Sequence, residues 1–163
     1  MQLAFTEMDT PVGVLKLVAH DHALVAVMWD NEDHKRVRLA NLVRQDDHSI
    51  LLKTQQQLQE YFAGQRQQFD LPLDFEGTEF QKKVWQALLS IPFGETRSYK
   101  QIAEQVGSVN AMRAVGAANG KNPISIIAPC HRVVGASGKL VGFAGGLDNK
   151  AILLKLESSN SKV

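Results

Sequence analysis

The stretch SYKQIAEQVGSVNAMRAVGAANG, residues 98–120, decides the fold of the second half of this chain. It opens with a capping-box pattern, in which Ser98 and Gln101 satisfy backbone groups of the first helical turn. The first helix is expected to end at the turn of residues 107–110, and residues 111–120 predict a second short helix. Helix, tight turn and helix in this order are typical of a helix-turn-helix unit.

Helices are also predicted on both sides of this unit. Thr78 and Gln81 repeat the capping-box pattern, and apolar residues then recur at helical spacing until Pro92. Beyond the unit, the chain runs through a mostly apolar segment, residues 124–134, and a glycine-rich loop. A last helix is predicted over residues 148–157.

The first half of the chain predicts strands followed by a helix. Residues 13–19 and 23–29 are short and rich in strand-forming side chains, which indicates an antiparallel hairpin. Residues 30–47 are dense in charge, and we expect a solvated loop there, including the acidic run that begins at Asp30. The glutamine-rich segment that follows has apolar residues at helical spacing, and Gly64 ends this helix.

These patterns predict an α+β fold with two lobes. Residues 1–76 form a small N-terminal lobe with an antiparallel sheet and a helix, and a short extended piece leads to a boundary near Gly77. Residues 77–163 form a mainly helical lobe that is winged-helix-like in its helix-turn-helix. The interface between the lobes is expected to fix the segment that contains Cys130.

Composition excludes several classes of protein. The chain has 163 residues, 44% hydrophobic and 21% charged, which is typical of a globular protein rather than of a disordered or fibrous one. Its apolar runs are too short for a membrane span, and its start lacks the pattern of a secretion signal. One cysteine forms no internal disulfide and no multi-cysteine zinc site. A cytoplasmic protein is expected.

The charge is divided unevenly. Residues 1–76 carry 7 Lys and Arg against 12 Asp and Glu, whereas residues 77–163 carry 11 against 5. A basic second half is suited to meet a polyanion such as DNA, although scatter alone also produces such an imbalance.

Cys130 is the candidate reactive residue. Most free cysteines are small buried hydrophobes, but this one is followed directly by His131 and Arg132. A nearby base or cation raises the thiolate fraction, which is the nucleophilic form. Neighbours in sequence need not share a face, so both interpretations stay open here.

The second helix of the helix-turn-helix is unusual for a reader of DNA sequence. It is rich in Ala and Gly, and Arg113 is its one charged residue. A major-groove reader normally offers several long polar side chains. Small residues allow close approach to DNA through phosphates and shape, and they equally suit a helix buried against its neighbour.

An ordered set of motifs carries a family resemblance. Pro129-Cys130-His131-Arg132-Val133-Val134 follows Arg113-Ala114-Val115-Gly116 and Asn122-Pro123, and Gly145-Gly146-Leu147 and a closing Leu-Glu come after it. From about Thr78 to Glu157 the chain resembles the O6-alkylguanine-DNA alkyltransferases, the methylated-DNA–protein-cysteine methyltransferases. The resemblance implies direct repair of DNA, in which an alkyl group passes irreversibly from O6 of guanine, or from O4 of thymine, to the protein.

The resemblance also assigns roles to residues. Cys130 is the alkyl acceptor, His131 takes up its proton through a water, and Glu157 orients that histidine. Tyr99 contacts the flipped nucleotide and protonates the departing guanine, and Asn122 braces the Cys130 turn. DNA contacts are assigned to Arg113, which fills the gap left by the flipped base, and to Ser98, Tyr99, Lys100, Ala114 and Gly116. The base pocket is assigned to Ser125, Val133, Gly138, Lys139, Phe143 and Ala144.

Further expectations follow from the same resemblance. The partner is double-stranded DNA with an alkylated base, bound through the minor groove by a bacterial, monomeric protein, with cooperative loading left open. No cofactor or metal is expected, because the reactive group comes from the substrate. Relatives that hold zinc in the first lobe use cysteines that this chain lacks. Phe143 and Ala144 stand where some relatives have tyrosine and serine, which makes the pocket less polar.

Three other functions compete with alkyl transfer. A non-reactive lesion sensor of the same architecture has its cysteine replaced, commonly by tryptophan, whereas Cys130 is present here. A helix-turn-helix regulator needs base-reading side chains that the Ala/Gly-rich helix lacks. A thiol hydrolase with a Cys–His pair requires a cycle that regenerates the free thiol.

Overall fold

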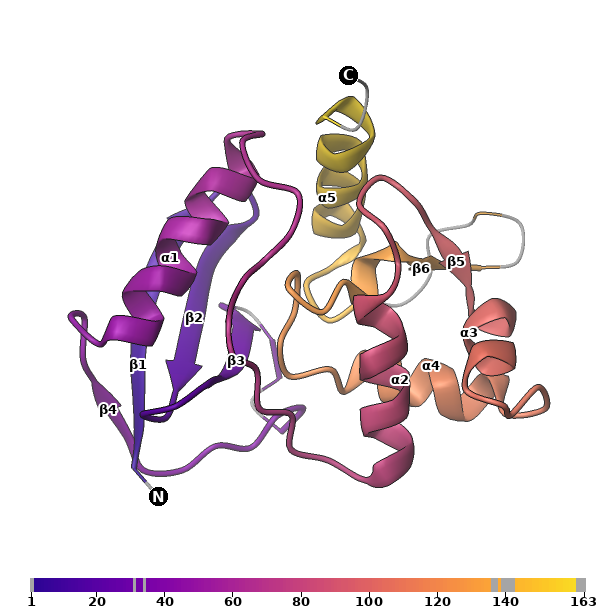
Figure 1. Cartoon of the computed structure of the whole chain (residues 1–163), viewed down its shortest axis with the longest axis horizontal. Helices are drawn as coiled ribbons and strands as arrows, with labels where there is room; N and C mark the ends of the chain where they lie inside the picture. Colours follow the sequence, from indigo (N-terminus) through magenta and orange to yellow (C-terminus); the bar gives the residue numbers. More distant parts are fainter. Residues whose placement is uncertain (1, 31, 34, 136–137, 139–142, 161–163) are drawn as a thin grey trace.

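The computed structural model describes residues 2–30, 32–33, 35–135, 138 and 143–160. Figure 1 shows a sheet covered on one face by a helix, and beside it a group of further helices. We call the sheet with the helix that covers it the first lobe, and the chain from residue 79 onward the second lobe. The α+β class and the two kinds of lobe predicted from the sequence are confirmed.

The sheet of the first lobe has the order β3-β2-β1-β4. Strands β1 (Leu3–Thr10), β2 (Gly13–Ala19) and β3 (Leu24–Trp29) are antiparallel neighbours, so the predicted hairpin is confirmed. Two strands were not predicted from the sequence, β1 and the short β4 (Leu42–Arg44), which pairs parallel to β1. The sheet is therefore mixed rather than wholly antiparallel.

Helix α1 (Ser49–Phe62) covers the sheet through a buried apolar face. Leu51, Leu58 and Tyr61 on this face are completely buried. After Gly64, which adopts a φ of 77°, the chain returns along the sheet. Leu24 of β3 bonds through its backbone to Pro72 and Asp74, which confirms the extended piece predicted there.

The second lobe contains the predicted helices. They are α2 (Glu79–Leu89), α3 (Tyr99–Gln105), α4 (Met112–Gly120) and α5 (Leu147–Asn160). Both capping boxes form in full, at Thr78–Gln81 and at Ser98–Gln101. Helices α3 and α4 form the helix-turn-helix. A parallel pair of two-residue strands, β5 (Arg97–Ser98) and β6 (Val133–Val134), joins its start to the chain beyond Cys130.

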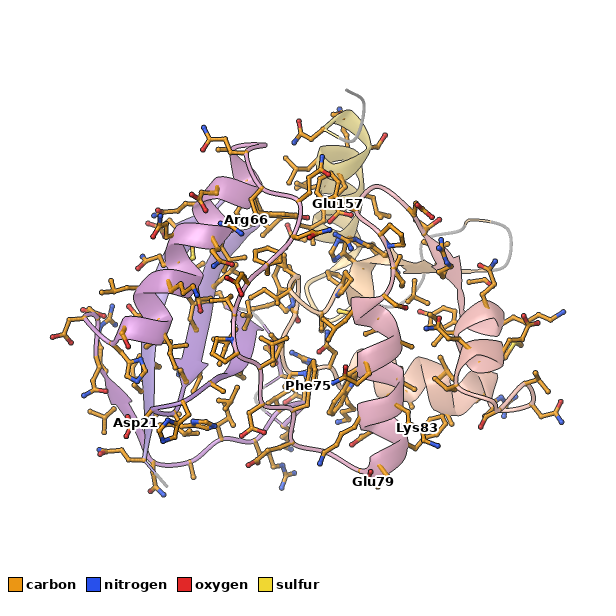
Figure 2. All side chains as sticks on the ribbon, viewed as in Figure 1. Asp21, Arg66, Phe75, Glu79, Lys83 and Glu157 are labelled. Carbon is orange, nitrogen blue, oxygen red and sulfur yellow. The ribbon has the colours of Figure 1, made fainter. Side chains whose placement is uncertain are left out.

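One hydrophobic core runs through both lobes. Its buried members include Leu17 and Val27 of the sheet, Leu88 of α2 and Leu153 of α5. Phe75, which lies between the sheet and α2 (Figure 2), stacks on Trp85 with 5.4 Å between ring centroids. The lobes thus share their interior. Within the described residues, every helix is too short or too polar to span a bilayer.

A glycine at the junction of the lobes allows this packing. A Cβ atom on Gly77 would lie 2.5 Å from the buried ring of Trp85, whereas one on Gly120, at the end of α4, would meet nothing within 4 Å. We therefore expect Gly77→Ala to lower the free energy of unfolding by about 1–3 kcal/mol through overpacking. Gly120→Ala is the matched control and should be neutral or slightly stabilising. Equal denaturation midpoints for the two variants would contradict this packing.

Candidate active site

Cys130 lies in a tight turn that is braced by hydrogen bonds from Asn122, eight residues earlier in the chain. It begins a 3-10 helix, Cys130–Arg132, and is 4% exposed. The side chain of Asn122 donates to the carbonyl of Ala128 at 2.9 Å and accepts from the backbone N–H of Ile124 at 3.0 Å. Ile126 adopts a φ of 73°, a conformation that is strained for a β-branched residue. The amide of Asn122 therefore spans the turn that presents the thiol, as the sequence predicts.

The thiol of Cys130 is held in its protonated form. Burial raises its pKa, while a hydrogen bond from Asn122 and the positive charges of Arg36 and Lys150 partly oppose this effect. Because desolvation disfavours the thiolate, the nucleophile forms only when a base removes the proton.

His131 and Glu157 lie together as predicted. His131 Nε2 is 2.7 Å from Glu157 Oε2, and both side chains are almost completely buried. Arg132 approaches the same carboxylate with two bonds, from Nε to Oε1 at 2.8 Å and from Nη2 to Oε2 at 3.1 Å. Its Nη1 donates to the carbonyl of Ile91 at 2.7 Å. Figure 2 shows Glu157 on α5, facing the region between the lobes.

The electrostatics of this group favour a carboxylate beside a neutral imidazole. Burial would raise the pKa of Glu157, but hydrogen bonds and positive charge from His131 and Arg132 outweigh it and bring the pKa to about 2. Burial lowers the pKa of His131, against the opposing effect of Glu157. With Nε2–H donating to Glu157, Nδ1 carries the lone pair. Nδ1 has no hydrogen-bond partner among the described residues.

Two further buried side chains, neither predicted from the sequence, bind this group and the backbone next to it. Tyr61 of α1 donates from Oη to Glu157 Oε2 at 2.5 Å. Lys150 of α5 is fully buried and donates from Nζ to the carbonyl of Val133 at 2.6 Å. Helical spacing predicts a buried position for Tyr61, but its partner comes from another lobe and leaves no signal in the sequence.

The helix-turn-helix brings Tyr99 between α4 and Cys130. Tyr99 is half-buried and packs against the core, and a Cβ on Gly116 would lie 3.8 Å from its ring. Burial raises the pKa of Tyr99, so its hydroxyl stays protonated at neutral pH. Asn119 of α4 donates to the carbonyl of Cys130 at 3.4 Å. The helix is thus coupled to the reactive turn.

The outer face of the unit carries the predicted DNA contacts. Arg113 and Ala114 on α4 and Lys100 on α3 are exposed, while the Ser98 hydroxyl caps α3 by accepting from the backbone N–H of Gln101 at 3.1 Å. Met112, beside Arg113, is also 47% exposed. The helix is therefore not buried on this face, which favours the DNA-facing interpretation over a purely structural one.

The predicted pocket residues fall into two groups. Ser125 and Val133 are buried, and the Ser125 hydroxyl accepts from Trp29 Nε1 at 3.1 Å. Phe143 is half-buried with its ring edge-on to Trp29, 5.4 Å between centroids. Ala144 is half-buried, Gly138 is exposed, and Lys139 lies outside the described residues.

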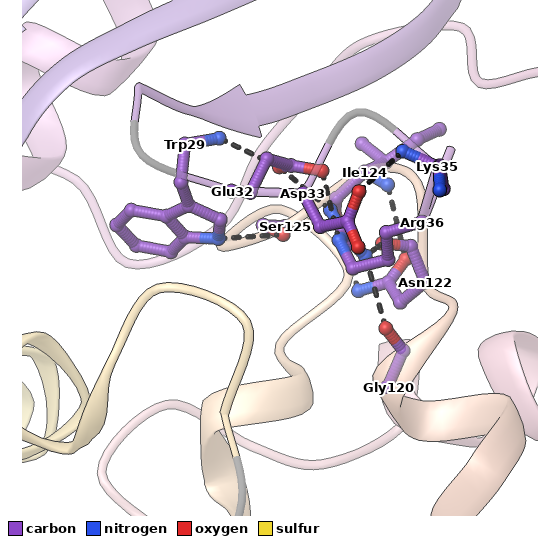
Figure 3. A network of polar contacts seen from close by, with 9 residues as sticks. All are labelled: Trp29, Glu32, Asp33, Lys35, Arg36, Gly120, Asn122, Ile124 and Ser125. Atoms are coloured by element: carbon purple, nitrogen blue, oxygen red, sulfur yellow. Dashed lines mark hydrogen bonds and ion pairs between the residues drawn. The ribbon is translucent and has the colours of Figure 1, made fainter. Parts of the chain in front are cut away.

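The sequence predicts a solvated loop for the acidic run of residues 30–33, but Glu32 in that run lies at the contact between the lobes. Glu32 is 3% exposed and pairs with Arg36 at 2.9 Å. Arg36 also donates to the carbonyls of Asn122 at 2.7 Å and Gly120 at 3.1 Å (Figure 3). Arg36 therefore links Glu32 of the first lobe to the backbone of the second lobe, and at this contact the Glu32 carboxylate is shielded from water. Among the described residues, no cluster of three or more His, Cys, Asp and Glu side chains is arranged to hold a metal.

Known families match both halves of the chain. Residues 3–75 match the family described as 6-O-methylguanine DNA methyltransferase, ribonuclease-like domain. Residues 79–159 match the family described as 6-O-methylguanine DNA methyltransferase, DNA binding domain. The two matches meet beside Gly77.

Individual proteins agree with these matches. The methylated-DNA–protein-cysteine methyltransferases of Methanosarcina mazei and Mycobacterium leprae are 56% and 50% identical, covering 94% and 92% of this chain and 96% and 89% of their own. The crystal structure of Mycobacterium tuberculosis OGT in complex with DNA has a TM-score of 0.88 at 45% identity, covering 98% of this chain and 94% of that one. With these similarities along nearly its whole length, the chain belongs to the family of 6-O-methylguanine DNA methyltransferases.

Proposed function

We propose that this protein repairs DNA by transferring the alkyl group of O6-alkylguanine to Cys130 in a single, irreversible turnover. The observation that carries the proposal is the buried Cys130 directly beside a neutral His131 that an ionised carboxylate orients. The names of the relatives and the family of the chain support the same reaction. The presence of the cysteine favours a transferase over a non-reactive lesion sensor.

The reaction requires a base on one side of the alkyl carbon and an acid on the other. His131 Nδ1 takes up the thiol proton through a water, and the sulfur attacks the alkyl carbon in line. A C–S bond forms while the C–O6 bond breaks, and the electron pair stays with guanine. Tyr99, whose hydroxyl is protonated, donates a proton to the departing base. The product is an S-alkylcysteine and an unmodified guanine, so each protein molecule reacts once.

Access to the alkyl carbon requires the base to leave the duplex. Extrusion costs a few kcal/mol, and a lesion that pairs poorly lowers this cost. Arg113 projects from the start of α4 and is suited to fill the vacated stack from the minor groove. Ser98, Lys100, Ala114 and Gly116 flank it, with phosphates dominating affinity.

The remaining features of the proposal concern the setting of the site. Ser125, Val133, Gly138, Lys139, Phe143 and Ala144 form the base pocket, in which Phe143 supplies an apolar face. The lobes divide near Gly77. We propose a monomer in the bacterial cytoplasm that acts without metal or cofactor, on O6-alkylguanine and on O4-alkylthymine where the pocket admits it.

The first prediction concerns the product. Mixing the protein with a short duplex that contains one O6-methylguanine should add the mass of one methylene to the peptide with Cys130 and saturate at one per protein. Intact and peptide mass spectrometry measures this. A retained preference for the lesion duplex with no gain in mass would instead indicate a non-reactive sensor. No gain in mass and no preference for the lesion duplex would indicate a general DNA-binding protein or a protein with other thiol chemistry.

The second prediction separates base flipping from chemistry. Arg113→Ala should reduce the rate on duplex DNA far more than the rate with a free O6-alkylguanine base, because only the duplex requires extrusion. Lys155→Ala, an exposed position on α5, removes the same charge and should leave both rates nearly unchanged. Equal losses on both substrates for Arg113→Ala would refute the role of this arginine.

The third prediction concerns the base. His131→Gln should slow single-turnover alkyl transfer by about 10²–10⁴-fold, the usual contribution of a positioned general base. Affinity for lesion DNA should stay within twofold, because His131 is buried away from the exposed face of α4. Binding titrations and rapid-quench kinetics give the two quantities, and weaker binding with unchanged chemistry would contradict the assignment.

A further inference from the structure

Tyr61 reaches the active site from the lobe that carries no other part of the proposed proton relay. It is the penultimate residue of α1, on the face that packs on the core, and its side chain is completely buried. Three aromatic rings hold its own ring: Phe62 at 5.2 Å, Phe69 at 5.5 Å and Phe93 at 6.2 Å between centroids. With its ring enclosed in this way, the hydroxyl has a fixed direction.

That direction leads to the carboxylate that orients His131. The Tyr61 hydroxyl lies 2.5 Å from Glu157 Oε2, which also accepts from His131 Nε2 at 2.7 Å and from Arg132 Nη2 at 3.1 Å. Burial raises the pKa of Tyr61 well above its usual value, and the charge of Glu157 adds to this effect. The phenol therefore stays neutral and remains a donor at every pH at which the protein works.

We propose that Tyr61 is a positioning residue for alkyl transfer, through which the first lobe fixes the Glu157 carboxylate in the orientation that holds His131. The inference rests on the proposed roles of His131 and Glu157. It gives the first lobe a direct part in the chemistry, in addition to its packing against the second lobe.

The hydroxyl has two effects on the relay. Three donors on Oε2 and one on Oε1 restrict rotation of the carboxylate, so the imidazole is held at one angle. The phenol also takes a share of the negative charge on Oε2 that His131 would otherwise share with Arg132 alone. Without it, the carboxylate binds the imidazolium form more strongly, and His131 keeps its proton to a higher pH.

The other groups around His131 do not substitute for this effect. Glu157, Arg132 and Lys150 are the charged side chains that act on His131, and Cys130 is its neighbour in the chain. Arg132 and Lys150 disfavour the imidazolium, and both remain in place when only the Tyr61 hydroxyl is removed. The change in the titration of His131 therefore reports on Tyr61.

The test compares Tyr61→Phe with the natural protein. In the unreacted protein, the ¹⁵N resonances of the His131 ring are followed against pH. They are assigned as the resonances that disappear in His131→Gln. We expect the midpoint to rise by about half a unit or more, a measurable fraction of the shifts seen in proteins. The acid limb of the pH–rate profile for alkyl transfer should shift to higher pH together with the His131 midpoint. At a given pH on that limb, the rate should therefore fall about threefold, while the affinity for DNA is unchanged.

Phe69→Leu is the matched control. It disturbs the packing of the same ring and leaves the hydroxyl in place, so it should lower the thermal midpoint without moving the His131 titration. An unchanged His131 midpoint in Tyr61→Phe would overturn the inference, as would an equal shift in Phe69→Leu. If the natural protein transfers no alkyl group, the proposed function fails, and the resonance titration still decides the role of Tyr61.

If the Tyr61→Phe variant does not fold, a second measurement on the natural protein tests the same inference. In the natural protein, the Tyr61 hydroxyl proton should give a slowly exchanging, strongly downfield resonance, because the bond is short and buried. Its position should change as His131 titrates, since both donors share one oxygen. A hydroxyl resonance that does not respond to that titration would overturn the inference.

Discussion

The buried carboxylate of Glu157 is the feature on which the rest of the site depends. It is 1% exposed and accepts hydrogen bonds from Tyr61, His131 and Arg132, which come from α1 and the Cys130 turn. A buried charge is tolerated only when such partners replace water, and loss of the oppositely charged partner of a buried ion pair costs about 3–5 kcal/mol. One side chain of α5 thus joins the first lobe to the reactive segment, and its ionised state keeps His131 in the tautomer that a base requires.

The first lobe supports the reactive segment along its length. The backbone of Val27 in β3 bonds to Pro123 and Ser125, and the Trp29 indole donates to the Ser125 hydroxyl. Arg36 binds the carbonyls at Gly120 and Asn122, where α4 ends and the turn begins. These contacts all fall within ten residues of Cys130. A strained residue such as Ile126 persists in this turn because the surroundings fix it from several sides.

Local signals in the sequence predict much of this molecule. The capping boxes at Thr78 and Ser98 involve residues three apart, so both helix starts were predictable. His131 stands next to Cys130 in the sequence, whereas Glu157 was singled out only by the family resemblance. Features that depend on the meeting of the lobes were not predictable. β4 lies in a charged stretch and forms only because β1 offers an edge, and the Glu32–Arg36 pair is buried by contact with the second lobe. Tyr61 and Lys150 resemble ordinary members of a helix face until their partners are known. The roles of the DNA-contacting and pocket residues stay predictions.

The depth of Cys130 has a consequence for the selectivity of the protein among electrophiles. A thiol that is 4% exposed, with a raised pKa and a base buried beside it, presents little thiolate to reagents dissolved in water. We therefore expect peroxide, glutathione disulfide and free alkylating agents to react slowly with this thiol. In the proposed reaction, the extruded base brings its alkyl group to the sulfur inside the protein. For a protein that each reaction inactivates, this shielding reserves the single cysteine for damage that is already in DNA.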